Sequence, residues 1–397
     1  MRARGAVAFA VALVALFAAG LWLGGHPSSL PDPLRDLFVE EPAGLTAEAA
    51  EAIEDSYYRP VGEAELGNAS LQGMVRELRR RHGDRFSEYF SPEALASFNE
   101  QIEGHFSGIG LTVVEVPKGL RVASVFSRSP AEQAGLAAGE TIVSVNGESI
   151  AGESSNEATK RIKGPEGTEV TIGVRDPKSA RVRRLTLTRA EVTLPNVSHR
   201  VERVDGRKLG YVRLLSFSEG AHGQLAGAVG KVQEEGVAGI VLDLRHNPGG
   251  LLQEAVRTAS LFLPEGEVVV STNSRSQGES TYETSGGQIT KLPLVVLIDG
   301  GTASAAEILT AALADDADAK VVGTRSYGKG VFQQEIGLSN GGALKLTIGE
   351  YFTPDGVNLA KSHGIHPDVR ARDDLRTARD EGLERALGVL ARQAPQQ

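Results

Sequence analysis

The stretch PLVVLIDGGTASAAEILTAALAD, residues 293–315, decides the fold of this chain. It opens with a short run of Leu, Val and Ile, which is typical of a strand buried on both faces, and a glycine-rich turn then leads into a helical pattern. GIVLDLR and LLQEAVRTASLFL, residues 239–245 and 251–263, repeat this order, and VVVSTN and AKVVGTR, residues 268–273 and 319–325, are predicted as further strands. Buried strands that alternate with helices predict a layered α/β core.

A smaller β-rich module is predicted before this core. Short alternating strands fill residues 108–190, and the dipeptide Asn146-Gly147 marks a turn between two of them. Two helical stretches interrupt the strands, SPAEQAG at residues 129–135 and SNEATKRIKG at residues 155–164.

Three short helices are predicted ahead of the β-rich module. Thr46 is expected to cap the first helix, Asn68 the second, and Ser91-Pro92 to open the third. Each pattern buries only one stripe of side chains, so these helices are expected to pack on something larger.

The N-terminal region predicts an exported protein. Arg2 and Arg4 precede an uncharged apolar run over residues 5–25, which is just long enough for a bilayer because about 20 residues are needed. The positive-inside rule then places the rest of the chain outside the cytoplasm. We favour a retained signal anchor over a cleaved signal peptide, because the apolar run continues through residues 21–23. The expected location is the cell envelope, as a single-pass membrane protein, or the periplasm or medium if the segment is cleaved.

The composition excludes several classes of protein. With 397 residues, of which 41% are hydrophobic and 23% charged, the chain has enough material for two or three folded domains. The net charge of −9 is spread without long single-sign blocks, which argues against nucleic-acid binding. The absence of cysteine removes thiolate nucleophiles, disulfides and Cys-based zinc sites. We also expect no metal at His363-x-x-His366, since Gly364 and Pro367 oppose the helix that would align the rings, and no cofactor.

Two glycine-rich turns place polar groups at the ends of buried strands. In DGGTASAAEIL, residues 299–309, Ser304 falls in the first turn of a helix, where free N–H groups favour negative charge. Ser304-x-x-Glu307 also fits a capping box, and on this motif alone capping is the favoured role. In DLRHNPGG, residues 243–250, the Pro-Gly-Gly turn exposes backbone amides that suit an oxyanion, although such turns also carry glycine for steric reasons.

The segment GTRSYGKGVFQQ, residues 323–334, is compatible with three motifs. It resembles the start of a phosphate-binding loop, but Gly330 stands where Ser or Thr is needed, and a strand pattern follows. Ser326-x-x-Lys329 matches a serine–lysine pair that requires a helix, which Gly328 and Gly330 disfavour. The third interpretation makes Lys329 a general base for a distant serine, because an apolar pocket disfavours the charged lysine. A solvated loop lysine is the alternative.

The β-rich module carries a peptide-binding pattern. GIGL, which comprises Gly108, Ile109, Gly110 and Leu111, places glycines before a strand, where successive N–H groups can bind a terminal carboxylate. The following strand is predicted to accept an extended peptide, with the helix at residues 155–164 as the other wall of the groove. On GIGL alone, a simple tight turn is the favoured interpretation. With SPAEQAGLAAGE, residues 129–140, the module resembles a PDZ domain of the type found in bacterial proteases.

Six segments in order resemble the C-terminal processing (tail-specific) peptidases over roughly residues 85–370. They are GIGL, SPAEQAGLAAGE, DLRHNPGGLL, DGGTASAAEI, VGTRSYGKG and ALKLTIGEYFTPDGVNLAKSHGIHPDV. The resemblance implies a serine endopeptidase on a crotonase-like α/β core, in which a PDZ domain binds substrate tails and gates activity. It implies Ser304 as nucleophile, Lys329 as base and Gln333 as the residue that assists the lysine. The implied oxyanion hole consists of the backbone N–H groups of Gly250 and Ala305.

The sequence is compatible with other assignments. His246 with Asp243 or Asp299 could form a triad around Ser304, although a histidine after a buried strand is as readily structural. A non-catalytic PDZ-type scaffold of the envelope is the alternative from another class, and nucleotide binding at residues 323–329 ranks third.

The expected organisation has six segments and few partners. The segments are a signal anchor or signal peptide (1–25), a linker (26–43), an N-terminal helical region (44–102), a PDZ domain (103–190), a serine protease core (191–372) and a helical tail (373–397). The expected partners are proteins or peptides with unstructured C-termini and, through the N-terminal segment, the membrane. The terminal helices are expected to support a homodimer.

Overall fold

The computed structural model describes residues 41–177, 181–374, 376–377 and 379–394. It contains two compact units, Met1–Ser91 with Glu335–Leu346 and Pro92–Gln334 with Thr347–Gln397. The apolar run over residues 5–25, expected as the anchor, lies outside the described residues. In the part of the chain that is described, no helix is long and apolar enough to cross a membrane.

The first unit combines two helices with a small piece of sheet. Helix α3 spans Glu41–Ser56 and helix α4 spans Glu63–His82. Strand β1 (Glu88–Phe90) pairs antiparallel with the start of β18 (Ala343–Phe352). The expected caps at Thr46 and Asn68 are wrong, because both helices begin earlier in the chain. Asn68 instead lies inside α4, where its side-chain oxygen accepts a hydrogen bond from the Tyr89 hydroxyl.

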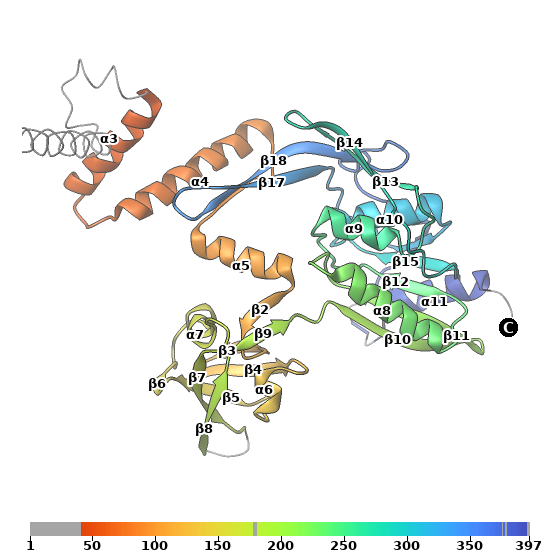
Figure 1. Cartoon of the computed structure of the whole chain (residues 1–397), viewed down its shortest axis with the longest axis horizontal. Coiled ribbons are helices and arrows are strands. Elements are labelled where there is room, and N and C mark those ends of the chain that lie inside the picture. Colours follow the sequence, from red (N-terminus) through yellow and green to blue (C-terminus); the bar gives the residue numbers. More distant parts are fainter. Residues whose placement is uncertain (1–40, 178–180, 375, 378, 395–397) are drawn as a thin grey trace, which may run out of the picture. The chain divides into compact units, whose positions relative to one another are not determined.

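The β-rich module in the second unit (Figure 1) is built around a strongly buried aliphatic core. Its sheet has the order β3-β4-β5-β7-β8, and β6 pairs with β5. These strands are β3 (Leu111–Val116), β4 (Gly119–Val125), β5 (Thr141–Val145), β6 (Glu148–Ser149), β7 (Glu169–Arg175) and β8 (Val182–Thr188). Helices α6 (Pro130–Gln133) and α7 (Ser155–Ile162) accompany the sheet, as the sequence predicts. A separate pair, β2 (His105–Gly108) and β9 (Ala190–Thr193), runs antiparallel after helix α5 (Pro92–Glu103).

Three of the four strands predicted for the α/β core lie in one six-stranded sheet, whereas the fourth, residues 268–273, belongs to a second sheet. The strand order is β10-β11-β12-β15-β16-β19, in which only the first pair is antiparallel. The strands are β10 (Val197–Val204), β11 (Arg207–Leu214), β12 (Ile240–Asp243), β15 (Leu294–Ile298), β16 (Lys320–Gly323) and β19 (Val369–Arg370). The carboxyl ends of parallel strands meet at one edge of a sheet, so the loops after β12, β15 and β16 come together there.

Helices cover both faces of this sheet (Figure 1). One face packs against α8 (Ala221–Glu234), α9 (Leu252–Ala259) and α10 (Ala305–Asp316), and the other against α11 (Glu381–Gln393). Successive strand residues serve opposite faces: Val295 packs towards α11, whereas Val296 packs towards the three-helix face. This double coverage explains why the strands read as continuous apolar runs.

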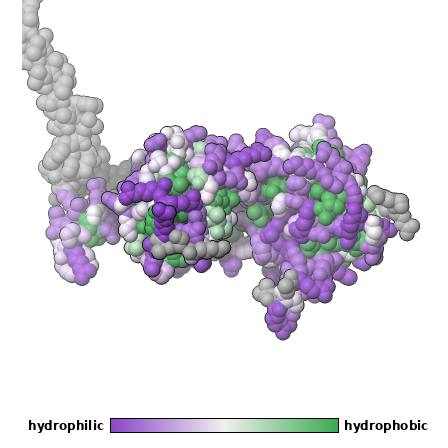
Figure 2. All heavy atoms as spheres, turned by 90° about the horizontal axis from the view of Figure 1, so that it is seen from below, coloured by the Kyte–Doolittle hydropathy of each residue, from purple (hydrophilic) through white to green (hydrophobic). Residues whose placement is uncertain are grey.

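A second sheet flanks the core. Strands β13 (Val268–Ser274) and β14 (Gly278–Glu283) pair antiparallel, β13 also pairs with the end of β18, and β17 (Val331–Gly337) pairs with β18. Most of the face drawn in Figure 2 is hydrophilic, with hydrophobic side chains in separate patches.

Candidate active site

Ser304 lies in a strained turn between β15 and α10. Its backbone has φ 57° and ψ −120°, in the left-handed half of the map that costs a non-glycine residue about 1–3 kcal/mol. Thr302 fixes the turn, because this residue is fully buried and its hydroxyl donates to the Leu244 carbonyl at 2.8 Å. The strain therefore presents the half-buried Ser304 side chain at the N-terminus of a buried helix.

The carboxylate of Glu307 connects Ser304 with the loop that carries Lys329. Glu307 has no exposed surface, and it accepts hydrogen bonds from the backbone N–H groups of Ser304 (2.9 Å), Gly328 (2.7 Å) and Lys329 (3.0 Å). It also accepts one from the Ser326 hydroxyl. Four donors compensate the cost of burying this carboxylate. The predicted contact from Glu307 back to Ser304 is present, and the same side chain also orders residues 326–329.

Lys329 directs its side-chain nitrogen towards Gln333. Its Nζ donates to Gln333 Oε1 at 2.8 Å, and Gln333 Nε2 in turn donates to Thr347 Oγ1 at 3.2 Å. The lysine side chain is half-buried and comes from the loop before β17. The two residues paired by the sequence resemblance are thus in direct contact.

Tyr351 is a member of the site that the sequence analysis did not find. Its ring is 2% exposed, and its hydroxyl donates to the Lys329 carbonyl. The pKa of Tyr351 is raised well above its ordinary value by burial and next by the nearby Glu307 carboxylate, while a hydrogen bond with the Ser304 side chain acts in the opposite direction. Tyr351 therefore stays protonated and contacts both Ser304 and the backbone of Lys329.

The turn after β12 brings glycines against Ser304. A Cβ added to Gly249 would come within 2.8 Å of Ser304 Cβ and 2.9 Å of the Ala305 nitrogen, and one added to Gly250 within 2.4 Å of the Phe217 carbonyl oxygen. Both glycines have positive φ, 97° and 146°. Only residues without a side chain allow this close approach.

Two backbone amides beside Ser304 are free to bind a ligand. The N–H groups of Gly250 and Ala305 donate no hydrogen bond within the described residues, whereas those of Gly249, Leu251 and Ala306 do. The two turns are held together by buried Asn247, whose carbonyl accepts from Ala303 N at 2.9 Å and whose side chain accepts from Gly249 N at 2.9 Å. Asn247 is a further residue that sequence reasoning missed.

The histidine alternative does not assemble a triad. His246 Nδ1 lies 2.8 Å from Asp299 Oδ2, but its side chain is 75% exposed, and no hydrogen bond joins it to Ser304 in the described part of the chain. Asp243 is fully buried and engaged by the Tyr211 hydroxyl and by Arg245.

The other interpretations of residues 323–334 lack their structural context. No helix follows the glycines, because β17 begins at Val331. Ser326 is buried and its hydroxyl is engaged by Glu307 and by Ile365 N, so it does not form a helical pair with Lys329. No group of three or more potential metal ligands occurs among the described residues, which include His363 and His366.

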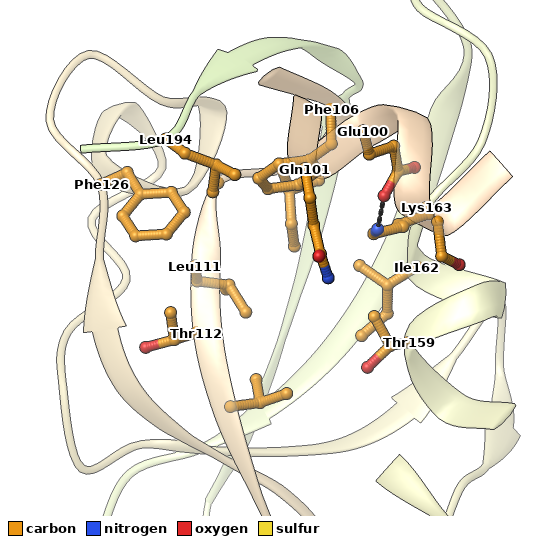
Figure 3. Close-up of a pocket in the computed structure, with 14 residues that line it drawn as sticks. Glu100, Gln101, Phe106, Leu111, Thr112, Phe126, Thr159, Ile162, Lys163 and Leu194 are labelled. Carbon is orange, nitrogen blue, oxygen red and sulfur yellow. Dashed lines mark hydrogen bonds and ion pairs between the residues drawn. The ribbon is translucent and has the colours of Figure 1, made fainter. Parts of the chain in front are cut away.

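A groove in the β-rich module is lined by three of the four predicted peptide-binding residues. Ile109, Gly110 and Leu111 line a cavity of about 300 Å³ between β3 and α7 (Figure 3). Within the described residues, the N–H groups of Ile109 and Gly110 donate to no other residue, although both residues are buried. Gly108 is not among the lining residues. Free N–H groups at the start of a groove suit a terminal carboxylate.

Comparisons with known proteins identify the class. The model of the PDZ domain matches residues 121–176, and that of peptidase family S41 matches residues 208–371. A photosystem II D1 C-terminal processing protease of known structure is 30% identical, with 87% of this chain and 96% of that chain covered and a TM-score of 0.49. The chain belongs to peptidase family S41 and carries a PDZ domain.

Particular relatives are found among bacterial proteases. A protein described as a probable CtpA-like serine protease of Staphylococcus haemolyticus (strain JCSC1435) is 32% identical over 324 residues, which cover 81% of this chain and 63% of the relative. The chain thus spans somewhat less than two thirds of that protein. A solved structure with an S41 protease description, from Bacteroides fragilis NCTC 9343, is 20% identical with a TM-score of 0.51, covers 86% of this chain and 92% of its own, and shares the fold.

Proposed function

We propose that this chain is a serine endopeptidase that cleaves proteins near their C-termini with a Ser304–Lys329 dyad. The observation that carries the proposal is the set of Glu307 hydrogen bonds, which hold the strained Ser304 and the backbone of Lys329 around one carboxylate. The contact of Lys329 with Gln333 and the two free amides supply the remaining groups that acyl transfer needs.

In the proposed mechanism, neutral Lys329 takes the proton of the Ser304 hydroxyl as the serine oxygen attacks the substrate carbonyl. Gln333 accepts a hydrogen bond from the amine and so orients its lone pair. The N–H groups of Gly250 and Ala305 stabilise the negative oxygen of the tetrahedral intermediate. The protonated Lys329 then donates its proton to the departing amine. In the second half of the reaction, Lys329 takes a proton from the water that attacks the acyl-enzyme and returns it to the Ser304 oxygen as the product acid leaves.

The PDZ groove is proposed to select and present the substrate. Its occupant is an unstructured C-terminal tail, added as a strand beside β3, with its carboxylate on the amides of Ile109 and Gly110. The domain limits in this proposal are 103–190 for the PDZ domain and 191–372 for a crotonase-like protease core.

Substrate tails test this proposal directly. A peptide with a free apolar C-terminus is expected to be cleaved with a KM at least about tenfold lower than that of its C-terminal amide, because the amide lacks the charge that the groove binds. Steady-state cleavage, followed by mass spectrometry, gives both values. Equal KM values for the two peptides would exclude tail recognition, and absence of any cleavage would favour the non-catalytic scaffold.

Tyr351→Phe tests the residue that the sequence did not reveal. Removing the hydroxyl deletes its contacts with Ser304 and the Lys329 carbonyl but keeps the buried ring, so kcat is expected to fall about tenfold with KM nearly unchanged. Tyr282→Phe on β14 is the matched control. An unchanged kcat in Tyr351→Phe would remove Tyr351 from the site.

The location and assembly of the enzyme form the last part of the proposal. The apolar run over residues 5–25 supports a membrane anchor with the protease outside the cytoplasm, and protein that alkaline carbonate releases from membranes would contradict it. Exposed apolar side chains on α3, on α4 and in the turn between them, namely Leu45, Met74 and Tyr58, support a homodimer. A monomer mass in analytical ultracentrifugation would contradict that part.

A further inference from the structure

The peptide groove has one cation on its lining, Lys163, at the C-terminal end of α7. The end of this helix is held firmly by Arg189, which is 8% exposed and donates to the carbonyls of Ile162 (2.8 Å) and Arg161 (3.2 Å). The Ser107 hydroxyl donates to the carbonyl of Gly164, the residue after Lys163, at 2.7 Å. Lys163 therefore extends from a rigid wall, and its side chain is 35% exposed.

Helix α5 supplies an anion to the same cavity. Ser97, Glu100 and Gln101 line the groove from α5, and the Glu100 carboxylate forms a hydrogen-bonded ion pair with Lys163 Nζ. Figure 3 shows this pair at one end of the cavity, beside Phe106, and the side chain of Gln101 between Leu111 and Ile162. The Lys163 ammonium also lies 5.0 Å from the centre of the Phe106 ring.

The ion pair with Glu100 neutralises the positive charge of Lys163, which an anionic ligand would otherwise contact. A peptide tail would bring one more carboxylate into a cavity that already contains Glu100, and the charge of Lys163 would already be neutralised by Glu100. The cavity is otherwise lined by apolar side chains and a few uncharged polar ones. Repulsion between two carboxylates and the loss of a free ammonium both disfavour such a ligand.

We propose that Glu100 is a built-in competitor for the substrate carboxylate and that Lys163 determines specificity for that carboxylate. When a tail binds, Lys163 leaves Glu100 and pairs with the carboxylate of the ligand. Lys163 then completes the anion site that the N–H groups of Ile109 and Gly110 begin. This inference rests on the proposed recognition of C-terminal tails and names the residues that set its affinity. Glu100 acts through Lys163 and is a positioning residue.

The test measures binding to the whole chain carrying Ser304→Ala, so that the probe is not cut. The probe is a fluorescein-labelled peptide that ends in alanine with a free carboxylate, followed by anisotropy, beside the same peptide as its C-terminal amide. Glu100→Gln is expected to tighten binding of the acid by about three- to tenfold, and Lys163→Gln to weaken it by a similar factor, as expected for a partly exposed charge pair. The amide is expected to respond to neither change.

Matched variants separate the charge effect from a structural one. Glu103→Gln removes the same charge from the same helix but from a side chain outside the cavity, so binding should be unchanged. Lys163→Arg keeps the charge and should restore most of the affinity lost in Lys163→Gln. The gain in Glu100→Gln should shrink at high salt, because exposed charges are screened.

The outcomes are distinguishable. Tighter binding of the acid alone in Glu100→Gln, with no change in Glu103→Gln, supports the competitor. Equal or weaker binding of the acid in Glu100→Gln overturns the proposed competition and shows that the ion pair only stabilises the fold. Failure of every form to prefer the acid over the amide would instead contradict the proposed tail recognition.

Discussion

Replacing Ser304 with alanine is expected to abolish peptide cleavage while tail binding is retained. The variant removes the hydroxyl of the proposed nucleophile at the strained N-terminus of α10, so no acyl-enzyme forms. We expect kcat to fall by about four orders of magnitude or more, as for other serine nucleophiles. The measurement is turnover of an unstructured peptide with a free apolar C-terminus, beside anisotropy with the uncut probe.

The matched control is Ser280→Ala, which removes an exposed hydroxyl on β14 and should leave turnover unchanged. Turnover by purified Ser304→Ala at the level of the unaltered chain would identify another nucleophile. Retained binding combined with lost turnover separates the enzyme from the scaffold, because a scaffold has no turnover to lose.

Replacing Lys329 with methionine is expected to lower kcat by about three orders of magnitude or more, since methionine fills similar space but cannot accept a proton. Lys329→Arg should be equally inactive, because a guanidinium stays charged and cannot act as a base. Stopped assays of peptide cleavage give kcat for both variants and for the unaltered enzyme.

His246→Ala provides the decisive comparison for the base. It removes the ring that lies against Asp299 and should retain nearly full activity, because the ring points into solvent and not to Ser304. Loss of activity in His246→Ala with activity kept in Lys329→Met would replace the dyad with a triad. Activity kept in Lys329→Arg would show that a positive charge, and not a base, is required.

Sequence patterns predict the buried strands and the helices that follow them, because their apolar residues repeat over short distances along the chain. Buried strands such as β12 and β15 have continuous apolar sequences because helices cover both faces of the sheet, and the strand–turn–helix order at residues 293–315 is confirmed. The predicted starts of α3 and α4 are wrong, because Thr46 and Asn68, which belong to residue types that favour caps, lie inside the two helices. Asn68 is needed elsewhere, as the acceptor for Tyr89.

The contacts of the candidate site also fall into those that the sequence predicts and those that depend on tertiary structure. The contact between Glu307 and Ser304 spans three residues and is readable from the capping-box spacing. The contacts from Glu307 to Gly328 and Lys329, and from Tyr351 to Lys329, depend on how distant loops meet, which no spacing in the sequence encodes. Likewise, the groove walls follow from the PDZ pattern, but the Glu100–Lys163 pair requires knowing where α5 packs.

The shared carboxylate of Glu307 has a thermodynamic consequence. Since one buried side chain holds the turn of Ser304 and the loop of Lys329, neither segment can open locally without leaving buried hydrogen-bonding groups unsatisfied in the other. The two segments therefore order and disorder as one cooperative unit. At equilibrium, most molecules then have both the Ser304 turn and the Lys329 loop ordered or both disordered. Few molecules have an ordered Ser304 beside a disordered Lys329.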